Sequence, residues 1–311
     1  MPSAIRRTMG PLEWAMLIAL SLIWGGSFFF NAVALRGFPP LTIVALRVGV
    51  GAICLWMIVL AMRYPFPRDP ALWLRFLAMG ILNNAIPFTL IVWGQQHIAS
   101  GLASILNATT PLFTVVVANV LLVDERLDPY RLFGVVAGFT GVAVMVGDTS
   151  GGLGRNIWAE LAILAASLSY AFASVYGRRF ANVPPMVTAA GQVTASSLVM
   201  VPLALWADRP WTFSAIGSDA WAAALSLAVV STALAYTLYF SILKRSGATN
   251  IVLVTLLNAP TAILLGSLFL HETVTLTDLA GLLAIGAGLA LIDGRPLRVL
   301  TALRRTEKTE G

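Results

Sequence analysis

Charged residues are scarce in this chain. Asp, Glu, Lys and Arg together make up 11% of the 311 residues, whereas hydrophobic residues make up 58%, and the mean hydropathy is +0.85. So little charge excludes an ordinary soluble domain and indicates an integral membrane protein. The fold is expected to be all-α, because the apolar runs have the length of about 20 residues that a membrane-spanning helix needs.

Side chains that bind metals or act as nucleophiles are also rare. The single cysteine, Cys54, lies within an apolar run, which excludes an intrachain disulfide. The two histidines, His97 and His271, are far apart in the sequence, and the segment "LHETVT" lacks the second histidine of an H-E-x-x-H zinc motif. We therefore predict no catalytic residues, no metal site and no cofactor, and we predict that the protein is not an enzyme.

Carboxylates are absent from the middle of every apolar run. All fourteen Asp and Glu residues fall in loops, in tails or near the ends of runs, and the deepest are Glu13, Glu160 and Asp278. Proton-coupled pumps commonly use a buried carboxylate relay. Its absence favours movement of a substrate down its own gradient. Coupling through an end carboxylate or through His97 is the alternative, although an interfacial role explains His97 more simply.

Ten apolar runs are present. They predict transmembrane helices at 12–34, 40–62, 71–93, 100–123, 129–147, 157–178, 184–206, 219–243, 248–270 and 276–293. Of the twenty Lys and Arg residues, sixteen fall on the side of the N-terminus, three fall on the other side, and Arg47 lies inside a span. The positive-inside rule then makes both termini cytoplasmic. The basic tail at 294–311 is expected to anchor to anionic lipid.

The two halves of the chain repeat one another. Glu125, Gly134 and Gly141 recur as Glu272, Gly281 and Gly288, each 147 residues later. Two further pairs recur at offsets of 145 and 148 residues, namely Pro39-Pro40 with Pro184-Pro185, and Phe88-Thr89-Leu90 with Tyr236-Thr237-Leu238. Each half, at 12–147 and 157–293, therefore holds five spans. Because five is odd, the second half enters the membrane from the opposite face, which predicts two inverted five-helix repeats.

These residues also carry a family resemblance. The segment "IWGGSFF", Arg47, and the series of proline, Glu, Gly and Gly in both halves resemble the EamA-type members of the drug/metabolite transporter superfamily. The resemblance extends from Trp24 to Asp293, and among branches it is greatest to the YddG-like bacterial exporters of aromatic and other amino acids. One departure is that Gln192 stands at the counterpart position of Arg47.

The resemblance implies a secondary transporter in the bacterial inner membrane. It implies export of small amphipathic metabolites, foremost amino acids, by alternating access around a central cavity. A drug or other metabolite exporter of the same fold, with or without proton coupling, is the alternative. The expected partners are a small-molecule substrate and membrane lipids, and no nucleic acid. The motifs Gly134-x-x-x-Gly138 and Ala284-x-x-x-Gly288 suit close helix packing, either within the chain or in a homodimer.

Polar and aromatic residues at membrane depth are the candidate substrate-binding residues. They are Trp24, Ser27, Arg47, Asn83, Asn107, Tyr170, Tyr236 and Asn258. The amide side chains are expected either to join helices or to line a cavity. The aromatic side chains either pack against lipid and helices or line a pocket. Arg47 either extends to the outer surface or provides a fixed positive charge that attracts a carboxylate.

Three prolines inside the spans are predicted hinges: Pro87, Pro111 and Pro260. A proline has no N–H and displaces the carbonyl four residues earlier, so Pro111 frees the carbonyl of Asn107 and Pro260 frees that of Leu256. Such groups must face protein or a watery cavity, because lipid cannot satisfy them. The two positions are expected either to be packed kinks or to belong to a substrate site.

Overall fold

A computed structural model of the protein describes residues 10–123, 125, 129–147, 156–246 and 253–293. Throughout these residues the secondary structure is helical, with no β-strand. The basic tail at 294–311 and residues 248–252, the predicted start of the ninth span, lie outside the described residues.

The helices follow the predicted spans closely. In the first half they are α1 (Pro11–Ala34), α2 (Pro40–Ala61), α3 (Pro70–Gly80), η1 (Ile81–Ala85), α4 (Ile86–Gly94), α5 (Ser100–Asn107), α6 (Thr110–Leu121) and α7 (Pro129–Gly147). In the second half they are α8 (Ile157–Tyr176), η2 (Gly177–Phe180), α9 (Pro185–Ala207), η3 (Pro210–Thr212), α10 (Ser218–Ala228), η4 (Val229–Leu234), α11 (Ala235–Ser246), α13 (Leu253–Phe269) and α14 (Leu276–Asp293). Seven helical segments among the described residues are long and apolar enough to cross a membrane, and three shorter apolar helices accompany them.

Proline and short polar side chains mark where these helices begin. Pro40 and Pro185 occupy the first turns of α2 and α9, where the missing N–H of proline costs no helical hydrogen bond. Asp69 caps α3 by accepting a hydrogen bond from the Ala71 N–H, and Asn156 caps α8 in the same way through the Trp158 N–H. The starts of the spans are therefore encoded locally.

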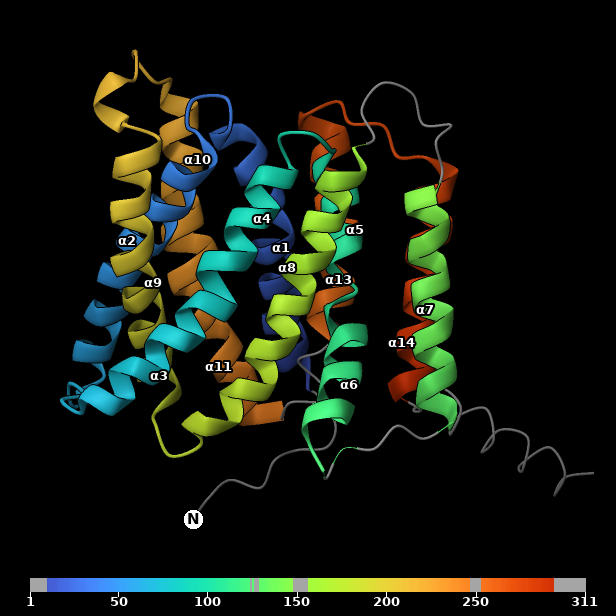
Figure 1. Cartoon of the computed structure of the whole chain (residues 1–311), viewed down its shortest axis with the longest axis horizontal. Helices are drawn as coiled ribbons and strands as arrows, with labels where there is room; N and C mark the ends of the chain where they lie inside the picture. The colour runs from blue at the N-terminus through green and yellow to red at the C-terminus, as the bar shows by residue number, and fades with distance from the viewer. Residues whose placement is uncertain (1–9, 124, 126–128, 148–155, 247–252, 294–311) are drawn as a thin grey trace, which may run out of the picture.

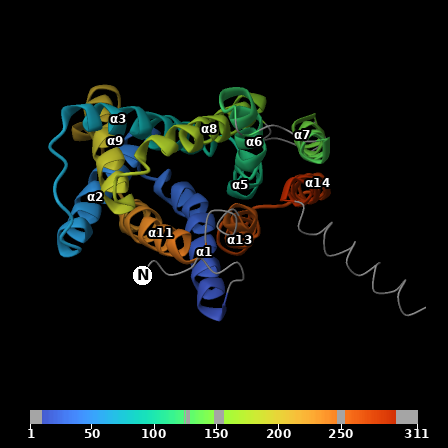
Figure 2. The same ribbon diagram turned by 90° about the horizontal axis from the view of Figure 1, so that it is seen from below.

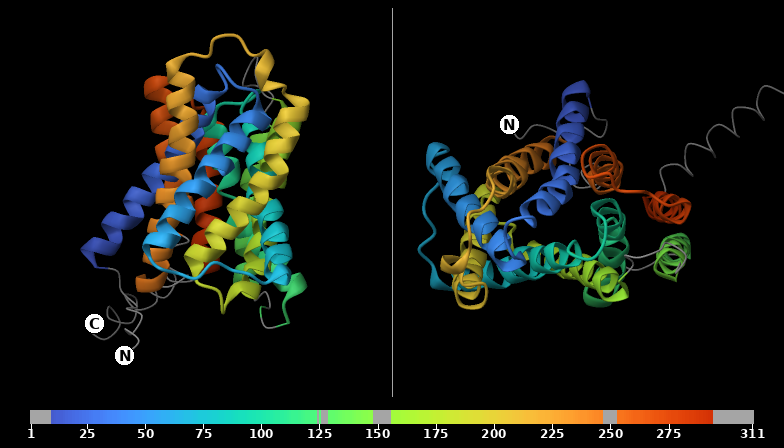
Figure 3. Two further views of the ribbon diagram at one scale, coloured as in Figure 1. Left: turned by 90° about the vertical axis from the view of Figure 1, so that its left-hand side faces the viewer. Right: turned by 90° about the horizontal axis from the view of Figure 1, so that it is seen from above.

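The helix contacts come in matched pairs. Helix α2 packs against α10 while α9 packs against α3, and α1 packs against α11 while α8 packs against α4. Helix α1 also contacts α13, as α8 contacts α5 and α6. Figure 1 shows α2 and α9 towards one end of the long axis and α7 and α14 at the other. The views along the helices in Figure 2 and in the right panel of Figure 3 show the α7–α14 pair outside the remaining bundle.

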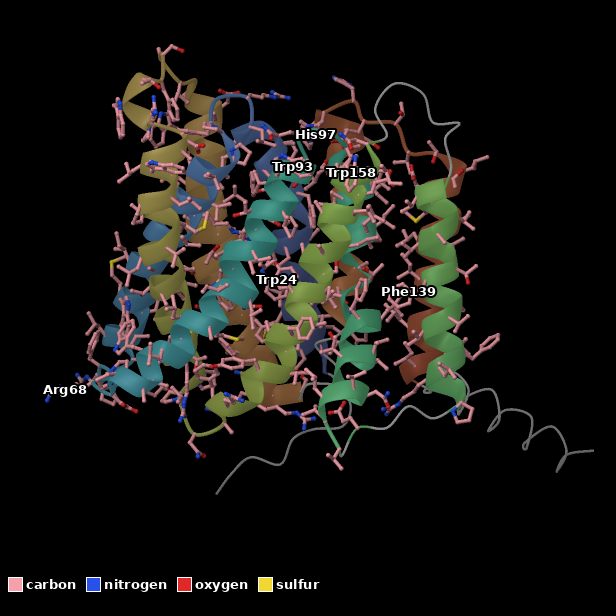
Figure 4. All side chains as sticks on the ribbon, in the orientation of Figure 1. Trp24, Arg68, Trp93, His97, Phe139 and Trp158 are labelled. Atoms are coloured by element: carbon pink, nitrogen blue, oxygen red, sulfur yellow. The ribbon has the colours of Figure 1, made fainter. Side chains whose placement is uncertain are left out.

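Glycines bring α7 and α14 together. A Cβ atom added to Gly134 would lie 2.6 Å from the Gly288 carbonyl oxygen, and one added to Gly288 would lie 2.5 Å from the Gly134 carbonyl oxygen. A Cβ atom at Gly141 would lie 2.5 Å from Cβ of Ala284 and 3.2 Å from the Gly281 carbonyl oxygen. The small-residue faces are therefore used within the chain. Phe139, labelled in Figure 4, joins this pair to α6 through an edge contact with Phe113, with ring centroids 4.8 Å apart.

The two proline positions behave differently. In the first half α5 ends at Asn107 and α6 begins at Thr110, so the helix is interrupted beside Pro111. In the second half α13 continues through Pro260, so the two halves differ at this position. The role of Pro260 as a hinge stays a prediction.

Candidate substrate site

Two π-helical turns occupy matching positions in the third and eighth spans. They are η1 at Ile81–Ala85 and η4 at Val229–Leu234, and their first residues are 148 residues apart, the same offset as between Phe88 and Tyr236. A π turn leaves a carbonyl without its usual helical partner and is frequent at functional sites. Side-chain hydroxyls supply that partner here, because Ser169 donates to the Leu82 carbonyl at 2.7 Å and Thr232 donates to the Leu227 carbonyl at 2.9 Å.

Arg47 of α2 points into the protein between these turns. It is 6% exposed, its Nε donates to the Thr232 hydroxyl at 3.2 Å, and its guanidinium carbon lies 3.8 Å from the centroid of the Phe88 ring. The side chain therefore does not extend to the outer surface. Tyr170 of α8 and Tyr236 of α11 lie close enough to interact with it electrostatically.

The guanidinium has no anionic partner among the described residues. The ion pairs found there join Arg178 to Glu125 and Arg245 to Glu13. Of the five N–H donors of Arg47, only that of Nε is hydrogen-bonded to a described residue. A buried positive charge is therefore left available to a ligand.

A network of amides and one phenol lies in the same region. Asn83 donates to the Gln192 side-chain oxygen at 3.3 Å and to the Tyr236 hydroxyl at 3.1 Å. The Gln192 amide donates to the same hydroxyl at 3.2 Å, and Tyr236 in turn donates to Asn84 at 3.3 Å. Asn84 then donates to the Ser196 hydroxyl at 3.3 Å. The network joins η1, α9 and α11, which come from both halves of the chain.

Aromatic rings extend from this network towards α1. Tyr236 stacks on Phe240 with ring centroids 6.0 Å apart, Tyr239 meets Phe240 edge-on at 5.2 Å, and Trp24 lies 5.5 Å from Tyr239. Figure 4 shows Trp24 in the middle of the bundle, whereas Trp93, His97 and Trp158 lie near one end of the helices and Arg68 at the other. A hydrogen-bonding and charged region thus continues into an aromatic one.

Asn107 lies at the helix break in the fourth span. The carbonyl that Pro111 frees accepts a hydrogen bond from the Thr110 hydroxyl at 2.8 Å. The hydroxyl of Ser167 on α8 lies 3.5 Å from both the carbonyl and the side-chain oxygen of Asn107. Neighbouring hydroxyl groups therefore satisfy this break locally.

Ser27 and Asn258 belong to α1 and α13, which pack together. Ser27 donates to the Trp24 carbonyl of its own helix at 2.6 Å, so its hydroxyl is engaged by the backbone. The Asn258 backbone carbonyl oxygen lies 2.5 Å from where a Cβ atom on Gly25 would be, which means that only glycine fits there. The Asn258 side-chain oxygen is buried and has no hydrogen-bond partner among the described residues.

The structure brings together part of the predicted site. Arg47, Asn83, Tyr170 and Tyr236 converge, and Trp24 is connected to them through aromatic contacts. Ser27, Asn107 and Asn258 lie elsewhere, at the contacts just described. Residues that the prediction omitted are Asn84, Phe88, Gln192, Ser196, Thr232, Tyr239 and Phe240. Two of these residues could have been found from the internal repeat. Gln192 is the counterpart of Arg47, and Phe88 is the counterpart of Tyr236.

No group of three or more His, Cys, Asp or Glu side chains that could hold a metal ion is found among the described residues.

Comparison with known proteins places this arrangement in a family. The family model of EamA-like transporters matches residues 12–147 and 157–293. The chain is 24% identical over 279 residues to the uncharacterized transporter YoaV of Bacillus subtilis, covering 88% of this chain and 94% of YoaV. It is 28% identical over 286 residues to the uncharacterized transporter YvbV of the same organism, covering 90% and 91% of the two chains. The uncharacterized inner membrane transporter YedA of Escherichia coli is 26% identical over 277 residues, 86% of each chain.

The fold is also found among solved structures. The crystal structure of another protein superposes on this one with a TM-score of 0.66 at 21% sequence identity, and the match covers 91% of this chain and 96% of the other chain. The apolar helices, the two matched halves and these likenesses agree with one another. The chain therefore belongs to the EamA-like transporter family, within the drug/metabolite transporter type, and is a multi-pass membrane transporter.

Proposed function

We propose that the protein is an exporter of small amphipathic metabolites, most of all amino acids and aromatic ones among them. Arg47 is the observation that carries the proposal, because it is a buried guanidinium with no carboxylate partner among the described residues. An unpaired buried charge is strongly unfavourable. A guanidinium binds a carboxylate through two parallel hydrogen bonds, so the carboxylate of a substrate would supply the missing partner.

The surroundings of Arg47 suit the rest of such a substrate. The hydrogen bonds of the Asn83–Gln192–Tyr236 network are 3.1 to 3.3 Å long, which is the long end of the range for such bonds. A polar substrate group can therefore replace one of them at small cost. The rings from Tyr236 to Trp24 offer an apolar surface to an aromatic or aliphatic side chain.

The proposed architecture is ten transmembrane helices arranged as two inverted five-helix repeats. The reciprocal contacts of α7 and α14 support it. Gly134 and Gly141 are the counterparts of Gly281 and Gly288, respectively. Gly134 meets Gly288 and Gly141 meets Gly281, so each glycine contacts the one that is not its own counterpart. A two-fold axis produces this exchange of partners. The positive-inside bias supports cytoplasmic termini, and the likeness to YedA supports the bacterial inner membrane.

Alternating access would tilt one half against the other around Arg47. Two carboxylates join the halves at the end of the bundle where His97 lies. Asp208 accepts from the N–H and the hydroxyl of Thr42 at 2.7 and 2.8 Å. Glu272 accepts from the N–H groups of Ser100 and Gly101 at 2.9 and 3.2 Å, and from the Ser100 hydroxyl. Opening of this end, the outer end in the proposed orientation, would break these bonds.

Counterflow in proteoliposomes tests the function. Vesicles preloaded with an unlabelled amino-acid mixture would receive labelled Phe, Thr or Met without a proton gradient. We expect the label to accumulate in wild-type vesicles and in Arg36→Gln vesicles, because Arg36 is exposed at the outer end. Arg47→Gln should lose the accumulation. No exchange of any amino acid by folded protein would contradict the proposal and would favour a drug or other metabolite exporter of the same fold.

A further inference from the structure

In the part of the chain that the structure describes, the site around Arg47 contains a cation but no anion. We infer that the transporter selects substrates by net charge, and that it binds a monocarboxylate anion with an aromatic or apolar tail in preference to the amino acid of the same shape. The inference rests on the proposed function and narrows it: the same site carries amino acids, but it binds them more weakly than the monocarboxylates of the same shape. It follows from the distribution of charge in the described residues.

The carboxylate of the substrate is matched in this site. Arg47 stacks on Phe88 on one side and uses only Nε in a hydrogen bond, to Thr232. The two terminal nitrogens of the guanidinium have no hydrogen-bond partner among the described residues. They form the planar fork that fits a carboxylate.

The ammonium group of an amino acid has no such match. Asp208 and Glu272 accept hydrogen bonds at the beginning of α2 and α5, and Glu13 pairs with Arg245 at the other end of the bundle. Within the described residues, no carboxylate takes part in the hydrogen bonds of the Asn83–Gln192–Tyr236 network.

The groups of the site that an ammonium group could contact are electrically neutral. The amide oxygen of Gln192 already accepts from Asn83, and the Tyr236 hydroxyl is already bonded to three amide side chains. The faces of Trp24 and Tyr239 can attract a cation, but this attraction is weaker than a carboxylate partner would give in a buried site. An amino acid must therefore give up the hydration of its ammonium group with little return, and a monocarboxylate avoids this loss.

Net charge also supplies a driving force. When an empty carrier returns after releasing an anion, each cycle moves one negative charge across the membrane. The inside-negative membrane potential drives anions outward. Export then requires no buried carboxylate relay, in agreement with the sequence, which has no Asp or Glu in the middle of a span.

Two compounds of nearly the same shape test the inference. L-phenylalanine and L-3-phenyllactate differ in that a hydroxyl replaces the ammonium group, so the second is an anion at neutral pH. In competition with labelled substrate in proteoliposomes, we expect phenyllactate to inhibit exchange at a concentration at least roughly tenfold lower than phenylalanine. On a solid-supported membrane, phenyllactate should produce a transport current and phenylalanine none.

Two variants and one control complete the test. Arg47→Gln should abolish the preference, so that phenyllactate and phenylalanine inhibit at about the same concentration. Arg36→Gln should retain the preference for phenyllactate. Asn83→Asp places a carboxylate beside Tyr236 and should reverse the preference towards phenylalanine, which keeps the test decisive if Arg47→Gln does not fold. Equal or tighter binding of phenylalanine, or flux of phenyllactate without current, overturns the inference but leaves the transporter function intact. Absence of exchange with either compound overturns the inference, and absence of counterflow with the amino-acid mixture also overturns the proposed function.

Discussion

Arg47 lies over the Phe88 ring, with its guanidinium carbon 3.8 Å from the ring centroid, and their counterparts in the second half, Gln192 and Tyr236, also touch. There the Gln192 amide donates to the Tyr236 hydroxyl at 3.2 Å. The same two helix positions thus form a pair in each half. One pair joins a cation to an aromatic face, and the other joins an amide to a phenol.

This difference explains how a repeated fold yields a directional site. The backbone contacts of the halves match one another, as the α2–α10 and α9–α3 packing shows. The side chains at the centre do not match. In the proposed two-fold scaffold, a substrate with one charged end and one apolar end would therefore bind in a single orientation.

Phe88 is expected to hold the guanidinium in place. Phe88→Leu removes the aromatic face, a cation–π contact that contributes about 0.5–2 kcal/mol. The half-saturating substrate concentration in counterflow should therefore rise roughly 2- to 30-fold. Phe88→Tyr keeps the ring and should remain within about twofold of the wild type. An unchanged affinity in Phe88→Leu would show that the ring does not position Arg47.

Tyr236 is expected to stabilise the folded protein through its hydroxyl. Tyr236→Phe keeps the stack on Phe240 but removes the group that accepts from Asn83 and Gln192. Leaving the N–H of the buried Gln192 and the side-chain oxygen of the buried Asn84 without this partner should lower the free energy of unfolding by about 1–3 kcal/mol, measured as thermal stability in detergent. Tyr239→Phe is the matched control, because no hydrogen bond joins the Tyr239 hydroxyl to a described residue. Equal losses in both variants would contradict the role of the network.

Much of the fold follows from local signals in the sequence. The apolar runs and the prolines at Pro40 and Pro185 predict where α2 and α9 begin, because proline is favoured in the first helical turn. The offsets between the halves relate Gly134 and Gly141 to Gly281 and Gly288, and all four glycines lie at the contact of α7 and α14. These features depend on residues near in sequence, or on a pattern that is repeated along the chain.

The rest depends on contacts between distant residues. Pro111 lies at a helix break whereas α13 continues through Pro260, and no local pattern distinguishes the two. The turn at η4 contains no proline at all. Gln192 departs from the family pattern, yet it bonds Asn83 and Tyr236 in the candidate site. The hydroxyl of Ser27 bonds the backbone of its own helix, and its predicted role in substrate binding stays a prediction.

Glu272 is expected to hold the two halves together at the end of the bundle that is the outer end in the proposed orientation. It accepts hydrogen bonds from Ser100 and Gly101 at the beginning of α5, and hydrogen bonds to a charged acceptor contribute about 1.5–3 kcal/mol. Glu272→Gln weakens them by removing the charge. A loss of about 1.4 kcal/mol would increase the open population roughly tenfold.

Thiol labelling measures this opening. A cysteine introduced by Ala99→Cys, in a Cys54→Ser background, should react faster with a membrane-impermeant reagent from outside when Glu272→Gln is present. Asp219→Asn is the control, because Asp219 is an exposed carboxylate at the same end of the bundle. Unchanged labelling in Glu272→Gln, or equal acceleration in both variants, would refute the assignment.

The contact between α7 and α14 gives the sharpest stability test, because one helix supplies both the variant and its control. Gly288→Ala would place a Cβ atom 2.5 Å from the Gly134 carbonyl oxygen and 2.9 Å from the Gly138 nitrogen, so the helices must separate. Such overpacking costs about 1–3 kcal/mol. Gly286→Ala meets nothing within 4 Å and should gain up to about 1 kcal/mol from the higher helix propensity of alanine. Thermal unfolding in detergent should therefore shift in opposite directions in the two variants. A shift in the same direction would mean that Gly288 is not at a close helix contact.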